Sequence, residues 1–206
     1  MNEQQKNHFK LNDSILYSLI EKLGDEANEI ELSQSNDYFS DLCEAIVNQQ
    51  LSEKAGRTIH NRFLAVLPNK LPTPKDITEI SDETLRSVGM SWSKVKYIKS
   101  LASSVLQKDI VFETIHELEY EEVIQELSKL HGIGRWSAEM FCMFSLGRPD
   151  VFSYGDAGLR RAIFLAYKFK KTPTEAQVKK IVQHWSPYKT YACRILWKSL
   201  DSGLLR

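Results

Sequence analysis

The segment LHGIGRWSA, residues 130–138, places two glycines two positions apart and leads directly into an apolar stretch. Val123 to Leu130 and Ala138 to Leu146 both have helical periodicity, so this segment is predicted to be a tight turn between two helices. Gly132 and Gly134 permit positive φ and close approach of another backbone. Such a hairpin directs backbone N–H groups outward near a helix N-terminus, which favours binding of an anion such as phosphate. The alternative is an interhelical turn without a ligand.

The rest of the chain is also predicted to be helical. Apolar residues recur at helical spacing, for example from Leu11 to Leu23, and several segments begin after a residue that can cap a helix. These potential N-caps are Asp37, Thr73, Ser81, Ser91 or Ser93, Asp156 and Thr174, and a further helix is expected from about Ser52 to Leu67. No strand-like alternation is sustained. We therefore expect an all-α fold with short loops, organised as a single domain over residues 1–206.

Composition excludes several protein classes. The longest apolar runs fall short of the roughly 18 residues that a membrane span needs. The polar segment MNEQQKNHFK at the N-terminus lacks the apolar core of a signal peptide. Cys43, Cys142 and Cys193 lie far apart without a C-x-x-C pattern, which argues against a disulfide framework, a zinc site and an iron–sulfur cluster. We expect a cytoplasmic protein with no membrane contact.

Charge is balanced overall but unevenly distributed along the chain. The formal net charge is zero, yet residues 1–53 hold 3 Lys/Arg and 11 Asp/Glu, whereas residues 128–206 hold 14 and 5. This polarity suggests that one side of the molecule faces a polyanion. An ordinary mixed surface explains the charge pattern equally well.

The segment GIGRWSAEMFCMFSLGRPDVFSYGDAGLRRAI, residues 132–163, resembles the helix–hairpin–helix DNA glycosylase superfamily along its full length. Four further segments resemble the alkylated-base branch, the 3-methyladenine DNA glycosylase II family: NDSILYSLIEKLG, AIVNQQLSEKAG, VGMSWSKVKYIKSLA and HWSPYKTYACRILW. The resemblance implies two helical subdomains with the active-site cleft between them, a helix–hairpin–helix at about 121–147 and a catalytic loop at about 148–158. Family members usually have proline where His131 and Ser153 stand, so these two loops are expected to be less rigid.

The resemblance places the catalytic carboxylate at Asp156, 20 residues beyond Trp136. The residues themselves predict a helix N-cap at this aspartate in YGDAGL, where the helix dipole stabilises a negative charge. Breaking an N-glycosidic bond develops positive charge on the deoxyribose, and a carboxylate beneath the sugar stabilises that transition state. It could also orient or deprotonate the attacking water. The alternative is a plain capping aspartate.

Trp136 stands where relatives that also cut the DNA backbone have a lysine that forms a Schiff base. The resemblance therefore implies a monofunctional enzyme that leaves an abasic site. Trp136 and Met140 lie one turn apart on one helix face, and a flipped methylated purine, which is cationic, could stack on the indole. Trp197 matches a pocket tryptophan of the family. Core packing is the alternative for each of these side chains.

The resemblance also assigns roles to two glutamines and to three backbone carbonyls. Gln50 falls at the position whose side chain fills the gap left by the flipped base, and Gln49 lies next to the pocket. Ser91, Lys94 and Lys96 are candidates for phosphate contacts, with a solvated helix face as the alternative. A monovalent cation, Na⁺ or K⁺, is expected to bind the backbone carbonyls of Ser128, Leu130 and Ile133.

We therefore predict a base excision repair hydrolase that flips and releases alkylated purines of the 3-methyladenine and 7-methylguanine type. Its expected partner is double-stranded DNA containing alkylated bases. We expect a monomer without a cofactor beyond the structural cation, nucleoid-associated in a bacterium. The alternatives are a glycosylase of the same fold for another damaged or mispaired base, and a non-catalytic helix–hairpin–helix DNA-binding protein.

Overall fold

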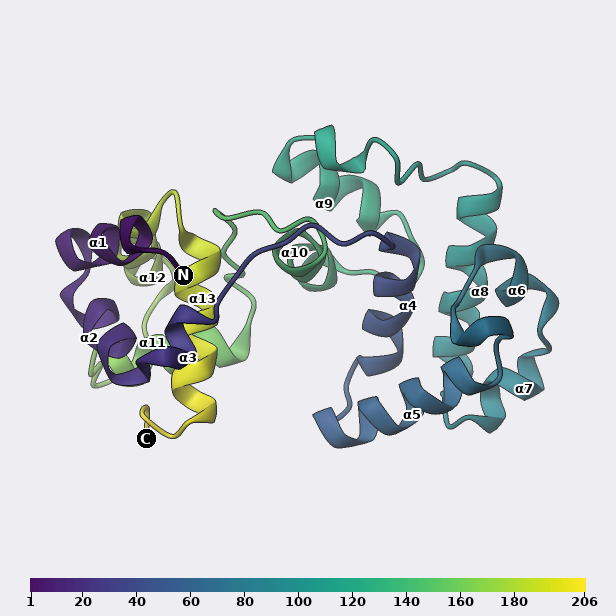
Figure 1. Cartoon of the computed structure of the whole chain (residues 1–206), viewed down its shortest axis with the longest axis horizontal. Coiled ribbons are helices and arrows are strands. Elements are labelled where there is room, and N and C mark those ends of the chain that lie inside the picture. Colours follow the sequence, from purple (N-terminus) through teal and green to yellow (C-terminus); the bar gives the residue numbers. More distant parts are fainter. The chain divides into compact units, whose positions relative to one another are not determined.

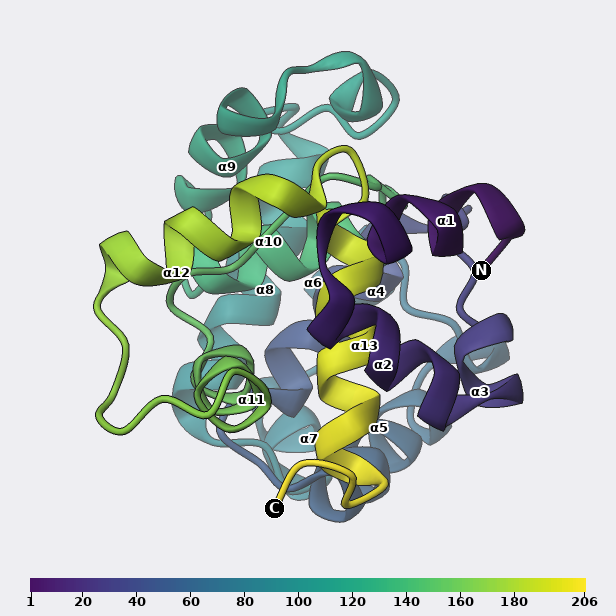
Figure 2. The ribbon, with the colours of Figure 1, turned by 90° about the vertical axis from the view of Figure 1, so that its left-hand side faces the viewer.

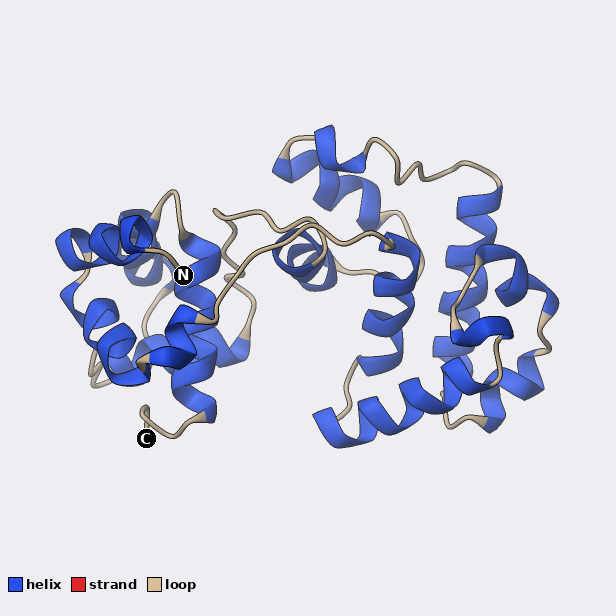
Figure 3. Cartoon of the chain, in the orientation of Figure 1, coloured by secondary structure: helices blue, strands red, loops and turns tan.

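The computed structural model describes the backbone of residues 1–206 and every side chain except that of Glu53. Over this backbone the chain forms helices and loops and no strand, which confirms the predicted all-α class (Figure 3). The chain divides into two compact units. Unit 1 comprises Met1–Gln34 and Gly147–Arg206, and unit 2 comprises Ser35–Leu146.

Unit 2 contains the glycine hairpin. Its helices, in chain order, are α4 (Tyr38–Asn48), α5 (Glu53–Ala65), α6 (Pro74–Glu79), α7 (Asp82–Ser87), α8 (Trp92–Leu106), α9 (Tyr120–Ser128) and α10 (Arg135–Phe144), with short 3₁₀ turns at Pro68–Lys70 and Ile115–Glu117. Helix α8 packs on α4, α6 and α7, and α10 packs on α9 and α4 (Figure 1). The hairpin is therefore supported by α4, and α4 is supported by α8.

Unit 1 is organised around the C-terminal helix. Its helices are α1 (Glu3–Asn12), α2 (Ser14–Leu23), α3 (Asp25–Asn28), α11 (Ala157–Ala166), α12 (Glu175–Val182) and α13 (Lys189–Asp201), with a 3₁₀ turn at Gln183–Trp185. Helix α13 packs on α2 and α11 (Figure 2). Segments from the two ends of the sequence thus share one core.

The predicted caps are correct, whereas the helical segment near the N-terminus was predicted wrongly. Each potential N-cap side chain accepts a backbone N–H of the first turn, with Ser91 rather than Ser93 capping α8. The expected helix from Leu11 to Leu23 is interrupted, because Asp13 ends α1 and caps α2. Helix α1 itself was missed; a capping box between Asn2 and Gln5 starts it in a segment with few apolar residues.

The uneven distribution of charge along the sequence does not produce one acidic unit and one strongly basic unit. Residues 1–34 of the acidic start and residues 147–206 of the basic end lie together in unit 1, which holds 15 Lys/Arg and 11 Asp/Glu, whereas unit 2 holds 12 and 16. The excess of basic residues in unit 1 is therefore modest. Across the described part of the chain, no helix has both the length and the apolar character needed to cross a bilayer.

Candidate active site

Asp156 is a buried carboxylate at the start of α11. It is the N-cap residue, only 8 % of its surface is exposed, and its Oδ1 accepts the backbone N–H of Leu159 at 2.7 Å. The N-terminal end of the helix dipole stabilises the negative charge at this position. The predicted cap is confirmed, and the geometry fixes the orientation of the carboxylate.

Trp197 on α13 holds the same carboxylate from a second direction. Its indole Nε1–H donates to Asp156 Oδ1 at 3.2 Å. Gly158 makes this approach feasible, because a Cβ there would lie 3.1 Å from Asp156 Oδ1 and 3.2 Å from Trp197 Nε1. The sequence had suggested Trp197 as a pocket wall, and neither its hydrogen bond nor the role of Gly158 was foreseen. Because 41 residues separate the bonded pair, no local pattern could show their contact.

The structure requires glycine at one of the two hairpin positions and not at the other. Gly132 has φ +91°, and a Cβ there would lie 2.3 Å from the ring of Tyr97 on α8. Gly134 has φ −93° and extended ψ, and a Cβ there would meet nothing within 4 Å. Ile133 between them is buried, as expected of a residue that pins the turn. Packing thus requires Gly132, whereas it does not require Gly134.

Gly134 leaves the N-terminus of α10 open. It is the N-cap residue of a ten-residue helix and is exposed to solvent, and it has no side chain to accept the first N–H groups. These groups are the kind of donors that hold an anion. The helix begins at Arg135, earlier than the expected start at Ala138.

Trp136 and Met140 lie on α10, one turn apart as predicted. The Trp136 side chain is 47 % exposed, which is high for an indole. Core packing therefore does not account for it. Met140 is half-buried.

Gln49 and Gln50 follow α4 and lie beside the hairpin. Gln49 Nε2 donates to the backbone oxygen of Gly132 at 2.9 Å, with Ser137 Oγ further away at 3.5 Å. Gln50 is exposed and has φ +56°, a left-handed conformation that is uncommon for a residue other than glycine. The loop that carries both residues is thus tied to the turn between α9 and α10.

Ser91 and Lys94 both stabilise the local fold, Ser91 as a predicted helix cap and Lys94 through contacts that were not predicted. Ser91 Oγ accepts the backbone N–H of Lys94 and caps α8. Lys94 Nζ donates to the backbone oxygens of Val47 at 2.8 Å and Gln49 at 2.7 Å. The ammonium group of Lys94 is thus directed at carbonyl groups that end α4, an arrangement that the prediction of a phosphate contact did not include.

A charged network that the sequence analysis missed joins the two helices of the hairpin. Arg135 Nε donates to Glu139 Oε1 at 3.0 Å, and its other nitrogens bind the Glu121 carboxylate of α9 at 2.8 and 3.2 Å. Glu139 is only 4 % exposed, and its Oε1 also accepts the hydroxyl of Tyr120. Burial raises the pKa of Tyr120, so this hydroxyl stays a donor. The i, i+4 spacing of Arg135 and Glu139 was the available signal.

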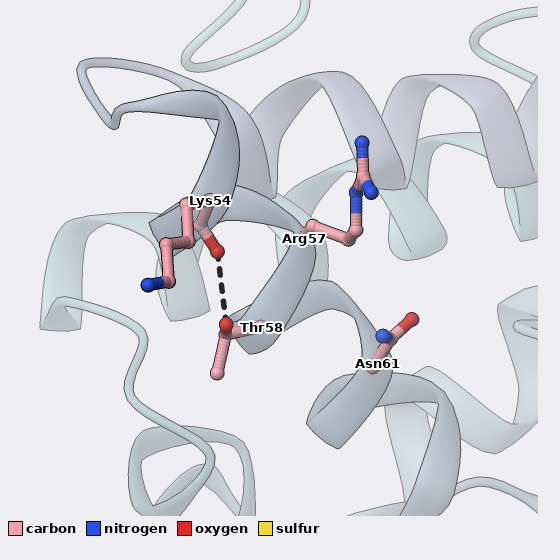
Figure 4. A pocket seen from close by; sticks show the side chains of 4 residues that line it. All are labelled: Lys54, Arg57, Thr58 and Asn61. Atoms are coloured by element: carbon pink, nitrogen blue, oxygen red, sulfur yellow. Dashed lines mark hydrogen bonds between the residues drawn. The ribbon is translucent and has the colours of Figure 1, made fainter.

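A basic pocket on α5 lacks the side-chain arrangement of a ligand-binding site. It measures about 280 Å³ and is lined by one face of the helix: Lys54, Arg57, Thr58 and Asn61 (Figure 4). The charged ends of Lys54 and Arg57 point apart, and the Thr58 hydroxyl donates to the Lys54 carbonyl at 2.8 Å. These groups do not surround one ligand.

The expected cation position lies at the end of α9 and in the hairpin. Ser128 ends α9, and the carbonyl of Leu130 accepts the N–H of Ile133 at 3.0 Å. A carbonyl oxygen that accepts one hydrogen bond retains a second lone pair for a cation. Nothing in the structure tests the occupancy, so a Na⁺ or K⁺ at Ser128, Leu130 and Ile133 stays a prediction.

Comparison with known proteins agrees with this geometry. The family model described as "HhH-GPD superfamily base excision DNA repair protein" matches residues 43–187. The chain is 34 % identical over 168 residues to DNA-3-methyladenine glycosylase 1 of Schizosaccharomyces pombe, covering 81 % of this chain and 74 % of that protein.

Two solved structures share the fold. One is a DNA-3-methyladenine glycosidase from Bacillus halodurans, with TM-score 0.83, 35 % identity and coverage of 98 % of this chain and 91 % of the other. The second is a 3-methyladenine DNA glycosylase from Schizosaccharomyces pombe in complex with abasic DNA, with TM-score 0.86, 31 % identity and coverage of 96 % and 97 %. The chain belongs to the HhH-GPD superfamily of base excision DNA repair proteins.

Proposed function

We propose that this protein is a monofunctional DNA glycosylase that hydrolytically releases alkylated purines from duplex DNA and leaves an abasic site. The relatives named as 3-methyladenine glycosylases support the substrate class. The observation that carries the proposal is the buried Asp156 carboxylate, held by the Leu159 N–H and the Trp197 indole N–H.

The carboxylate acts on the sugar. As the N-glycosidic bond breaks, positive charge develops on the deoxyribose, and a fixed negative charge stabilises this transition state more than the ground state. The two hydrogen bonds to Asp156 keep the group oriented before the reaction, so little reorganisation is needed. The same carboxylate is suited to orient the attacking water or to accept its proton.

The base is recognised by stacking. Trp136 presents an exposed indole, and Met140 lies one turn further along the same face of α10. A purine methylated on a ring nitrogen carries positive charge, and the π face of an indole attracts a cation. An electron-poor alkylated base therefore gains more from this surface than a normal base does.

The hairpin binds the DNA backbone, and the reaction stops at the abasic site. Backbone N–H groups at Gly134 and the first turn of α10 are suited to hold a phosphate. An enzyme that also cuts the strand uses an amine to form a Schiff base, and Trp136 stands at the position where such relatives have lysine. We propose a monomer acting on double-stranded DNA.

Incubation with methylated duplex DNA tests the proposal. Chromatography of the supernatant should show 3-methyladenine and 7-methylguanine, and the strand should stay intact until alkali cleaves it at the abasic sites. Release of a base only from parallel duplexes that carry an oxidised or mispaired base would assign a different substrate. Tight DNA binding without release of any base would identify a non-catalytic DNA-binding protein.

A further inference from the structure

The loop between α4 and α5 holds an unusual backbone conformation at an exposed side chain. Gln50 is exposed and has φ +56°. A residue other than glycine stays in this region only when its surroundings hold it there, and such residues gather at functional sites. We call residues Asn48–Leu51 the α4–α5 loop.

The ammonium group of Lys94 holds one end of this loop. Its Nζ donates to the carbonyls of Val47 and Gln49, the residues on either side of the end of α4. The last carbonyls of a helix carry partial negative charge, so a cation is favoured there. Burial lowers the pKa of Lys94, as expected for an ammonium withdrawn from solvent.

The same loop is connected to the hairpin. Gln49 donates its side-chain N–H to the backbone oxygen of Gly132, and the ring of Tyr97 occupies the space beside Gly132. Tyr97 and Lys94 are three residues apart on α8, so they lie on the same face. One helix therefore supports both the loop that presents Gln50 and the turn that presents Gly134.

We propose that Lys94 is a positioning residue: it fixes the α4–α5 loop so that Gln50 can enter the duplex held by the hairpin, and it does not contact a phosphate. This inference rests on the proposed glycosylase function. Removing Lys94 should therefore impair base flipping and excision, while leaving the electrostatic part of DNA binding unchanged.

Two variants separate positioning from phosphate contact. Lys94→Met removes the ammonium group, and Lys75→Met, at an exposed position on the neighbouring helix α6 that is assigned no role in DNA binding, is the matched control. Three quantities are measured for each: the single-turnover excision rate at saturating methylated duplex, the fluorescence of a 2-aminopurine reporter of flipping, and the salt dependence of affinity for undamaged duplex. Each lost phosphate contact lowers the log–log salt slope by about 0.9.

We expect Lys94→Met to lower the rate and the flipping signal about tenfold with an unchanged salt slope, and Lys94→Arg to restore part of both. Lys75→Met should leave the rate unchanged. Because Lys94 acts through the loop, Lys94→Met combined with Gln50→Gly should be no worse than the more severe single variant. If the Met variant is not folded at the assay temperature, Lys94→Gln replaces it in the same cycle.

A salt slope reduced by about one contact in Lys94→Met, an unchanged excision rate, or additive losses in the double variant would each overturn the inference. Its failure is distinguishable from that of the proposed function. If the wild-type protein releases no base, the proposed function fails, whereas flipping and salt slope on a duplex with an abasic analogue still decide the role of Lys94.

Discussion

Helices α10 and α11 are both ten residues long, and both begin at a loop that the sequence marks as functional, but their N-termini differ. The N-cap of α10 is Gly134, which is exposed and has no side chain to accept the N–H groups of the first turn. The N-cap of α11 is Asp156, which is buried and accepts the N–H of Leu159 with its own carboxylate. The N-terminus of α10 is therefore open, meaning that no capping side chain accepts its N–H groups, whereas the N-terminus of α11 is closed by a carboxylate.

The difference suits the two helix N-termini to different functions. An open helix N-terminus can receive a negative charge from outside, such as a phosphate of DNA. A closed one supplies a negative charge of its own, held in a fixed orientation. In this protein the first arrangement is suited to bind the nucleic acid and the second to stabilise the cation that forms on its sugar.

The largest expected effect comes from neutralising the closed terminus. Asp156→Asn keeps an oxygen that can accept the N–H of Leu159, so α11 should keep its cap. It removes the negative charge, and we expect the single-turnover excision rate to fall on the order of 10²-fold or more. Affinity for abasic-analogue DNA should change little. A rate similar to that of wild type would end the assignment of Asp156 as the catalytic group.

The next largest effect concerns stability and distinguishes the two hairpin glycines. Gly132→Ala places a Cβ against the Tyr97 ring at a residue with φ +91°. Strain and overpacking together should lower the free energy of unfolding by about 2–3 kcal/mol. Chemical denaturation measures this change. The matched control is Gly134→Ala, whose Cβ enters open space and should cost well below that amount; equal losses would contradict the distinction.

Closing the open terminus should weaken DNA binding. Gly134→Asp gives α10 the kind of cap that Asp156 gives α11, so the fold should be retained or slightly stabilised. The added carboxylate opposes a phosphate, and we expect affinity for both damaged and undamaged duplex to fall by about 2 kcal/mol, roughly 30-fold. Gly134→Ser, a neutral cap, is the control and should lose much less. A folded Asp variant with wild-type affinity would return Gly134 to a simple turn residue.

The smallest effect should come from the second hydrogen bond to the carboxylate. Trp197→Phe retains an aromatic ring beside Gly158 but removes the N–H that donates to Asp156. A hydrogen bond to a charged group contributes about 1.5 kcal/mol, so the excision rate should fall roughly tenfold. In an Asp156→Asn background the same change should have a smaller effect, because the charge is absent; an undiminished effect there would place Trp197 in another role.

Local features of this chain were predictable because local chemistry decides them. Asp37, Thr73, Ser81, Thr174 and Asp156 could be identified as caps because short polar side chains accept helical N–H groups wherever they precede an apolar period. Helix α1 could not be found in this way, since its segment has only Phe9 as a large buried side chain. Its formation depends on packing within unit 1 rather than on periodicity.

Contacts between segments that are distant in the chain could not be predicted from the sequence. The bond from Trp197 to Asp156 and the bonds from Lys94 to the end of α4 connect residues more than 40 positions apart. Both involve residues that the sequence had selected, but for other tasks: a stacking surface and a phosphate contact. Residue type and position in the family pattern identify candidate functional residues, whereas the tertiary fold determines which groups their side chains contact.

The most direct test measures the Asp156→Asn and Gly134→Asp variants in parallel, each for the single-turnover excision rate at saturating DNA and for affinity to abasic-analogue duplex. The account predicts opposite outcomes. Asp156→Asn should lose the rate and keep the affinity, whereas Gly134→Asp should lose the affinity and keep most of the rate once the DNA is saturating. If both variants lose rate and affinity together, or if Gly134→Asp alone abolishes the rate at saturation, the two helix N-termini do not perform separate tasks and the account is contradicted.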